Sequence, residues 1–124
     1  MVKFSEMKYQ RPDLDALKQE MGQLVEQLKA ADSYQAAREV FLRKEELGRH
    51  IQTMSTLANI RHSIDTRDEF YDGEVKFWNA AGPELEEYSQ AWNLAMLNSP
   101  FRGDFSQEYG DLMFINAEIA LKTF

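Results

Sequence analysis

The sequence predicts an all-α protein, a bundle of about five helices preceded by an extended N-terminal arm. Apolar residues recur at intervals of three and four along most of the chain, the spacing that gives a helix one buried face. Signals that start or stop helices, chiefly Pro, Gly and Ser, separate these stretches. No segment of useful length alternates polar and apolar residues, as a strand with one buried face would.

Two helices are predicted in the first half of the chain. Residues 1–11 form the arm, because bulky side chains there stand between polar neighbours. Pro12 and Asp13 are typical of a helix start. The apolar stripe that follows comprises Leu14, Leu17, Met21, Leu24 and Leu28. Its spacing predicts a helix that ends near residue 30. Ser33 can cap a second helix, which no proline interrupts before residue 64.

Three shorter helices are predicted in the second half. The first runs from about residue 67 to 80 and ends at Gly82-Pro83, since proline breaks a helix interior but suits a first turn. The next begins there and stops near Ser99-Pro100. The last occupies roughly residues 104–123.

The composition indicates one domain and argues against several classes of function. The 124 residues suffice for a single domain with its own core. Residues 63–124 carry four basic and twelve acidic residues. Such a surface repels phosphate backbones, so no nucleic-acid partner is expected. No apolar stretch approaches the length of a membrane span. The absence of cysteine excludes thiolate chemistry here and favours a cytoplasmic location.

The segment RHSIDTRDEFYD, residues 61–72, concentrates charged groups between the predicted second and third helices. Thr66 and Glu69 fit the S/T-x-x-E pattern of a capping box. In that motif the two side chains satisfy backbone amides at the start of a helix. We therefore predict that these two residues cap the third helix.

The other charged groups of this segment form a candidate site. Arg61 and His62 continue apolar rows of the second helix and are expected to point inward. An inward charge needs a partner, and Asp65 is the nearest candidate. Arg67 and Tyr71 complete the predicted polar cluster. Three interpretations stay open: a structural cluster, a surface facing a ligand or another domain, and a catalytic site.

Neither of two metal patterns typical of helical enzymes is present. A zinc peptidase helix has the sequence H-E-x-x-H, with two histidines one turn apart. The only histidines, His50 and His62, are twelve residues apart. Di-iron bundles use Glu-x-x-His pairs, but Leu47 and Asn59 stand three residues before these histidines. No metal ligand and no catalytic residue is therefore assigned.

Four stretches carry a family resemblance: KFSEMKYQRPDLDAL, MSTLANIRHSIDTRDEFYDGE, SPFR and INAEIALKTF. They resemble the N-terminal region of zinc oligoendopeptidases, the relatives of oligoendopeptidase F, thimet oligopeptidase and the PZ-peptidase-like enzymes. The resemblance covers essentially the whole chain. It implies a helical, non-catalytic N-terminal domain of a longer peptidase, predicted to be inactive alone.

The same resemblance implies partners and a place for the candidate site. Zinc is expected in the full-length enzyme and no cofactor in this chain. The implied partners are the catalytic domain of the same polypeptide and short peptides. The implied place of the matching positions is the wall or hinge of a peptide channel. These positions are Arg61, His62, Asp65, Thr66, Arg67, Asp68, Glu69, Phe70 and Tyr71.

The predicted last helix is apolar on more than one face, as expected of a helix covered on more than one side. Its large apolar residues include Leu112, Phe114, Ile115, Ile119, Leu121 and Phe124. The sequence stops there without a helix-ending signal, so we expect a fragment of a longer peptidase. In isolation it is expected to form a homodimer through this helix. The alternative is a self-contained helical module that binds a partner protein with the same face.

Overall fold

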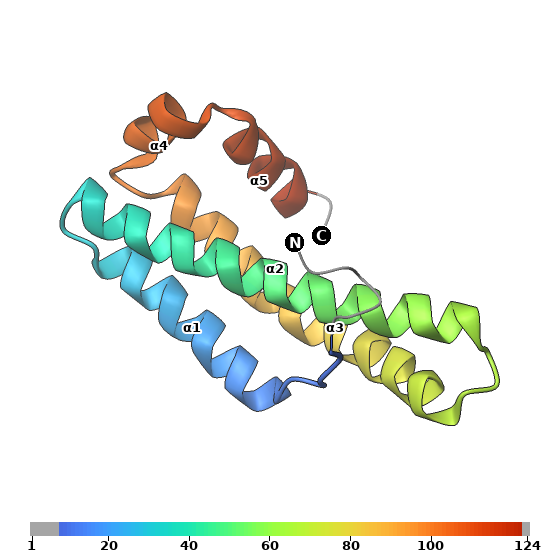
Figure 1. Ribbon diagram of the computed structural model, residues 1–124. Helices are drawn as coiled ribbons and strands as arrows, with labels where there is room; N and C mark the ends of the chain where they lie inside the picture. Colours follow the sequence, from blue (N-terminus) through green and yellow to red (C-terminus); the bar gives the residue numbers. More distant parts are fainter. Residues whose placement is uncertain (1–7, 123–124) are drawn as a thin grey trace.

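The computed structural model describes residues 8–122, and this part of the chain is all-α. Its five helices are α1 (Leu14–Ala30), α2 (Tyr34–Ile64), α3 (Glu69–Leu97), α4 (Arg102–Tyr109) and α5 (Leu112–Lys122) (Figure 1). The predicted fold class is confirmed. Residues 1–7 of the predicted arm and 123–124 of the predicted last helix lie outside the described residues. No described helix is long and apolar enough to cross a membrane.

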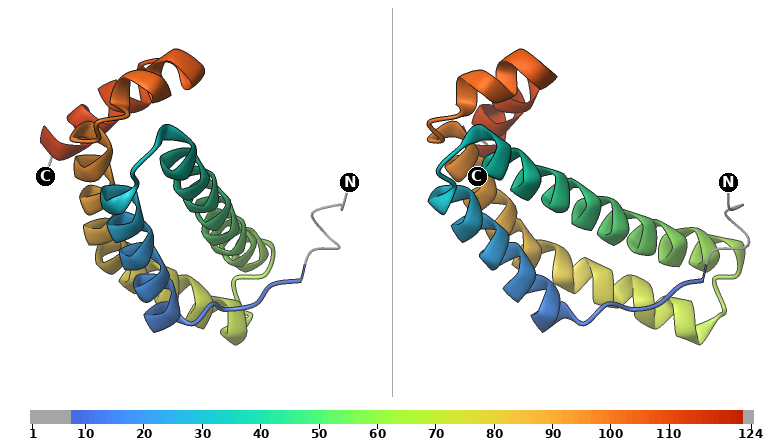
Figure 2. Two further views of the ribbon diagram at one scale, coloured as in Figure 1. Left: turned by 90° about the vertical axis from the view of Figure 1, so that its left-hand side faces the viewer. Right: turned by 60° about the vertical axis from the view of Figure 1, so that its left-hand side comes forward.

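The long helices α2 and α3 form an antiparallel pair that runs the length of the molecule (Figure 1). Helix α1 packs against both of them, and α5 packs on α3. Figure 2 shows that α4 and α5 fold back over the end where α1 meets α2. The opposite end, where α2 turns into α3, projects beyond α1 as a helical hairpin. We call this end the hairpin tip, residues 60–72.

The first two helices begin where the sequence predicts. Asp13 Oδ1 accepts a hydrogen bond from the Ala16 amide at 3.2 Å, and Ser33 Oγ accepts one from the Ala36 amide at 3.1 Å. Each cap satisfies an amide that has no partner within the helix. The stripe on α1 turns Leu17, Leu24 and Leu28 into the core.

The predicted break at Gly82-Pro83 is wrong, because α3 continues through it as one helix. A proline interior to a helix loses one backbone hydrogen bond and crowds the carbonyl four residues earlier, here that of Asn79. Both Asn79 and Pro83 face solvent, so water can satisfy that carbonyl. On the other side, Ala81 and Leu85 are buried against α1. This packing on both sides of the proline holds the helix together.

The predicted helix over residues 104–123 is two helices, α4 and α5. Gly110 ends α4 with a φ of +87°, a left-handed conformation that glycine adopts without strain. Its amide donates to the Ser106 carbonyl at 2.8 Å. The chain therefore turns at Gly110, and α5 folds back onto α3.

The core is richest where all five helices meet. Phe105 of α4 and Phe114 of α5 are fully buried against Trp92 of α3 and Phe41 of α2. Phe114, one of the large apolar residues of the predicted last helix, is thus part of the core. A smaller cluster around Trp78 and the fully buried Leu57 continues between α2 and α3 toward the hairpin tip.

Candidate functional site

Two aspartates build the turn of the hairpin tip. Asp65 Oδ1 accepts a hydrogen bond from the Arg67 amide at 3.0 Å, and the Asp68 amide donates to the Asp65 carbonyl at 3.2 Å. Asp68 then caps α3, because its Oδ1 accepts from the amides of Phe70 and Tyr71 at 2.9 and 3.4 Å. The turn thus fixes where α3 begins and which way its first side chains point.

The predicted capping box is wrong in its residues. Thr66 is exposed within the Asp65 turn, and α3 begins only at Glu69. The ionised carboxylate of Asp68 accepts two amides, and its charge meets the positive end of the helix dipole. Asp68 therefore takes the capping position that the pattern gives to Thr66. Glu69 remains as an acidic residue of the first turn.

Among the described residues, the half-buried Arg61 and His62 both have contacts on α3, whereas Asp65 contacts Arg67. Arg61 Nη1 donates to the Tyr71 hydroxyl at 3.1 Å, and the guanidinium lies 5.9 Å from the centroid of that ring. His62 Nε2 lies 3.4 Å from Asp72 Oδ1. These contacts tie the last turn of α2 to the first turns of α3.

Asp65 and Arg67 take no part in the contacts that Arg61 and His62 make with α3. Arg67 is 94% exposed, and its Nε is 3.8 Å from Asp65 Oδ1. An exposed pair of this kind contributes little to stability. The structure therefore brings Arg61 and Tyr71 together and leaves Arg67 free to meet another molecule or domain.

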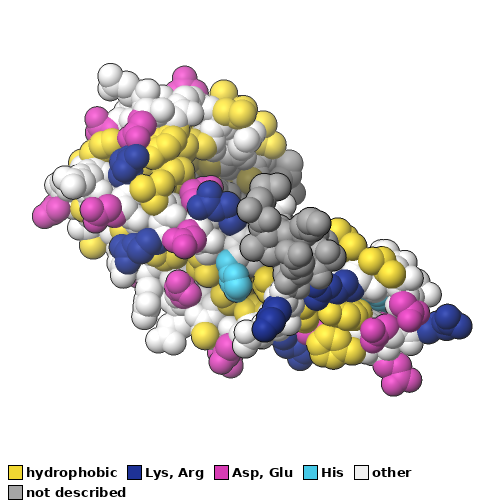
Figure 3. Space-filling view, viewed as in Figure 1, with side chains coloured by type: hydrophobic (Ala, Val, Ile, Leu, Met, Phe, Trp, Pro, Cys, Tyr) yellow, Lys and Arg dark blue, Asp and Glu magenta, His cyan; other side chains and the backbone are white. Residues whose placement is uncertain are grey.

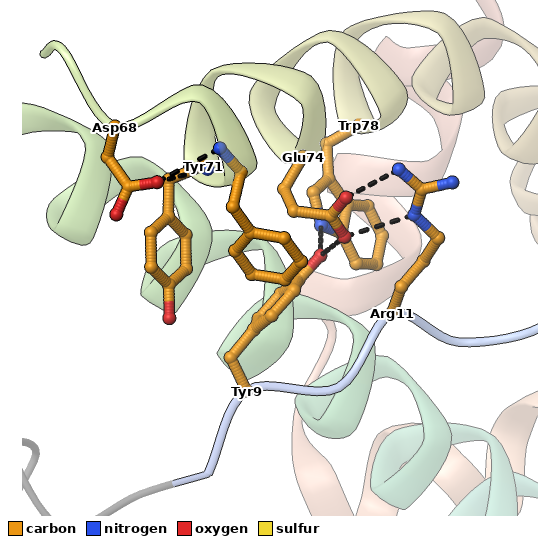
Figure 4. A network of polar contacts seen from close by, with 7 residues as sticks. Tyr9, Arg11, Asp68, Tyr71, Glu74 and Trp78 are labelled. Carbon is orange, nitrogen blue, oxygen red and sulfur yellow. Dashed lines mark hydrogen bonds and ion pairs between the residues drawn. The ribbon is translucent and has the colours of Figure 1, made fainter.

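A buried carboxylate, Glu74, forms a second polar centre that the sequence analysis did not predict. Figure 4 shows it on α3, facing the arm that precedes α1. Glu74 is 4% exposed and accepts hydrogen bonds from the Tyr9 hydroxyl at 2.7 Å and from Arg11 Nε at 3.0 Å. A second guanidinium nitrogen of Arg11 bonds the other oxygen. Trp78 Nε1 donates to the Tyr9 hydroxyl at 3.1 Å. We call these four residues the arm anchor.

The arm anchor shifts two pKa values in the directions its contacts require. Hydrogen bonds from Arg11, against the opposing effect of burial, hold the pKa of Glu74 below its ordinary value. Burial, followed by the bond to Glu74, raises the pKa of Tyr9 to about 12. The carboxylate is thus ionised and the phenol neutral at neutral pH, so each group can keep its role in the network.

One signal for the arm anchor is present in the sequence. Glu74 stands in the row that contains Tyr71, Trp78, Ala81 and Leu85, the face that α3 buries. A carboxylate in such a row needs a partner. The partners, Tyr9 and Arg11, lie more than sixty residues away in an irregular segment. Helical periodicity places no such segment in space.

The described residues offer no arrangement of ligands for a metal ion. No group of three or more His, Asp or Glu side chains is gathered within residues 8–122. The two polar centres described above instead join α2, α3 and the arm. These contacts hold the two helices and the arm in position.

Large apolar side chains are exposed on several of the described helices, and the most exposed of them lie at the hairpin tip and on α5. At the hairpin tip Ile64 and Phe70 are 80% and 57% exposed. On α5 a row at helical spacing is uncovered, with Leu112, Ile115 and Ile119 at 67%, 51% and 54% exposure. Figure 3 shows hydrophobic surface both over α4 and α5 and at the hairpin tip, where charged groups surround it. We call the row on α5 the α5 row. Exposed apolar patches of this kind mark surfaces that contact other protein.

The comparison with protein families gives one match over nearly the whole chain. The model described as the Peptidase M3 N-terminal domain matches residues 4–124. Comparison with curated proteins gives no match.

Solved structures provide close likenesses. The chain is 36% identical to a structure described as an oligoendopeptidase F, with a TM-score of 0.94 over 100% of this chain. It is 33% identical to PZ peptidase A with inhibitor 2, with a TM-score of 0.93 over 98% of this chain. It is 32% identical to an oligoendopeptidase F from Bacillus anthracis str. Ames, with a TM-score of 0.92 over 97% of this chain. The chain spans 22% of the length of each.

Proposed function

Since this chain belongs to the family of peptidase M3 N-terminal domains, we propose that it is the non-catalytic N-terminal domain of a zinc-dependent oligoendopeptidase. Its role there is to form part of the wall of the channel that holds short peptides. The family match does not favour the alternative, a self-contained interaction module. Because the chain spans 22% of its structural relatives, activity and peptide substrates belong to the proposal.

The α5 row is the observation that supports a contact between this domain and the rest of the polypeptide. Fully burying one large aliphatic side chain stabilises a protein by roughly 1.5–3 kcal/mol. Leu112, Ile115 and Ile119 are 67%, 51% and 54% exposed. Covering them would therefore contribute about 2–5 kcal/mol in total. We propose that the catalytic domain of the same polypeptide provides this cover, and that a second copy of the chain does so when the domain is isolated.

The hairpin tip is proposed to face the channel. It projects from the bundle and presents the exposed Arg67 beside Ile64 and Phe70. Arg61 and His62, tied to α3 by their contacts with Tyr71 and Asp72, support this surface from behind. A wall of this kind acts by limiting which peptides enter and how they lie, which affects binding more than the chemical step.

Zinc belongs to the catalytic domain in this proposal. When bound there it would activate a water molecule and polarise the peptide carbonyl. No residue of this chain is assigned to it. The composition without cysteine supports a place for the enzyme in the reducing cytoplasm.

The wall proposal can be tested in the full-length enzyme with Arg67→Ala. We expect KM for peptides to change severalfold, with different ratios for short and long peptides, while kcat changes little. Lys29→Ala is the matched control, because Lys29 is an exposed cation on α1 that pairs with Glu26 of the same helix rather than with a residue of the tip. Equal effects of the two variants on every peptide would contradict a channel-facing tip. A large loss of kcat alone for Arg67→Ala would make the residue part of the chemistry instead.

A further inference from the structure

A cavity between α2 and α3, which Met21 of α1 also lines, contains a lysine that makes no ion pair with the described residues. The cavity has a volume of about 340 Å³ and lies on both long helices, with Lys44 as the one charged residue that lines it. Lys44 is half-buried, and its Nζ lies 5.7 Å from the centre of the Trp92 ring. It makes no hydrogen bond or ion pair with the described residues.

An ammonium group in this position is prepared to bind an anion. It carries three donors, and the aromatic ring beside it satisfies none of them as a carboxylate would. The protein has a formal net charge of −7, so acidic groups predominate over basic ones. This cavity differs, because it is lined by a lysine and by no carboxylate. A neighbouring cavity below α5 shares Lys44 but also includes Glu45. An anion is therefore better placed on the α2–α3 side.

The rest of this cavity suits an extended peptide. Its apolar lining includes Leu47, Ile51 and Leu85, which can hold an aliphatic or aromatic side chain. Gln52 and Ser89 also line it, and no side-chain hydrogen bond occupies them within the described residues. Such groups can pair with the free amides and carbonyls of an extended backbone, whereas a helix satisfies its own.

The cavity is open where it would receive a ligand. A Cβ atom added at Gly48 or Gly82, which line opposite walls, would meet nothing within 4 Å. The volume is near the lower end of the range for small-ligand pockets, about 300–1,000 Å³. It therefore fits the end of a short peptide and excludes a folded partner.

We propose that the α2–α3 cavity binds the C-terminal end of short peptides, with the terminal carboxylate on Lys44 and the last apolar side chain between α2 and α3. Every short peptide has this carboxylate whatever its sequence, so the contact would select for peptide ends. The inference deepens the proposed function, since it rests on short peptides being the ligands. It differs from that function in naming one residue and one chemical group.

The test is a calorimetric or NMR titration of this chain with N-acetyl-Ala-Leu-Phe as the free acid and as the C-terminal amide. We expect the free acid to bind at least about tenfold more tightly, the range for a hydrogen bond to a charged group. Lys44→Met should remove that difference, and Lys44→Arg should restore it. Gly48→Leu should weaken both ligands by filling the cavity. Gly103→Leu is the control, because Gly103 is also open but lies on α4.

Equal affinity for the acid and the amide would overturn the assignment to Lys44. A preference for the acid that persists in Lys44→Met would also overturn it. The absence of binding at millimolar peptide would do the same, provided that circular dichroism shows a folded chain. None of these results bears on the wall role, which is judged from KM in the full-length enzyme. Conversely, if Arg67→Ala had no effect on KM in the full-length enzyme, the result of the peptide titration would still stand.

Discussion

Replacing Glu74 with Gln should destabilise the domain by removing the charge at the centre of the arm anchor. Glu74 is 4% exposed and accepts from Tyr9 and Arg11. Breaking a fully buried ion pair costs about 3–5 kcal/mol. Arg11 is 49% exposed and can return to water, so the cost here should be lower. We expect about 1.5–3 kcal/mol, the range for hydrogen bonds to charged groups.

Urea unfolding followed by circular dichroism measures this change, and pH separates charge from packing. The pKa of Glu74 is lowered in the folded protein, so the unfolded state binds more protons below its own pKa, about 4.3. The stabilisation by Glu74 is therefore complete above that pKa and is lost as pH falls through the folded value. The difference between wild type and Glu74→Gln should shrink accordingly in acid.

Glu84→Gln is the matched control. Glu84 also pairs with a cation across two helices, Lys18 at 2.8 Å, but its side chain is half exposed. We expect little effect from that substitution at any pH. If Glu74→Gln is no more destabilising than Glu84→Gln, or if its deficit is independent of pH, the arm anchor does not stabilise the fold as described.

Three further tests concern the fold and the α5 row. In urea unfolding, Asp68→Ala should lower the free energy of unfolding by about 1 kcal/mol, because Asp68 caps α3, whereas Thr66→Ala should change it very little. The reverse order would favour Thr66 as the capping residue. Pro83→Ala should raise the free energy of unfolding by about 2 kcal/mol, because the substitution removes the unfavourable effect of proline in a helix but also loses the restriction that proline places on the unfolded chain. A lower melting temperature for this variant would refute the prediction. In sedimentation at micromolar concentration the isolated chain should dimerise, and Ile115→Lys with Ile119→Lys should make it monomeric; a wild-type monomer at every concentration would contradict the role of the α5 row.

The fold class and the starts of the first two helices could be predicted because they depend on local chemistry. The stripe from Leu14 to Leu28 and the caps at Asp13 and Ser33 are local patterns, and the structure confirms them. Pro83 shows where this reasoning fails. Proline is unfavourable in a helix when considered alone, but burial of Ala81 and Leu85 outweighs that local cost. A rule based on residues adjacent in the sequence does not include the effect of tertiary packing.

The candidate site could be predicted only in part, for a similar reason. The inward direction of Arg61 and His62 follows from helical rows, but their partners depend on the register between α2 and α3. The arm anchor depends on where residues 8–13 lie, and an irregular segment has no periodicity from which to place it. The cavity at Lys44 likewise depends on how α1, α2 and α3 pack against one another, which no local pattern specifies.

Peptide hydrolysis by separately produced pieces of the enzyme tests the central claim most directly. The pieces are this chain and the remainder of the polypeptide, assayed apart and mixed with peptides of increasing length. We predict that this chain has no activity, that the remainder alone is impaired or loses its limit on peptide length, and that mixing restores both rate and limit. Hydrolysis by this chain alone, or a remainder whose rate and length limit equal those of the intact enzyme, would contradict its role as a non-catalytic wall of the peptide channel.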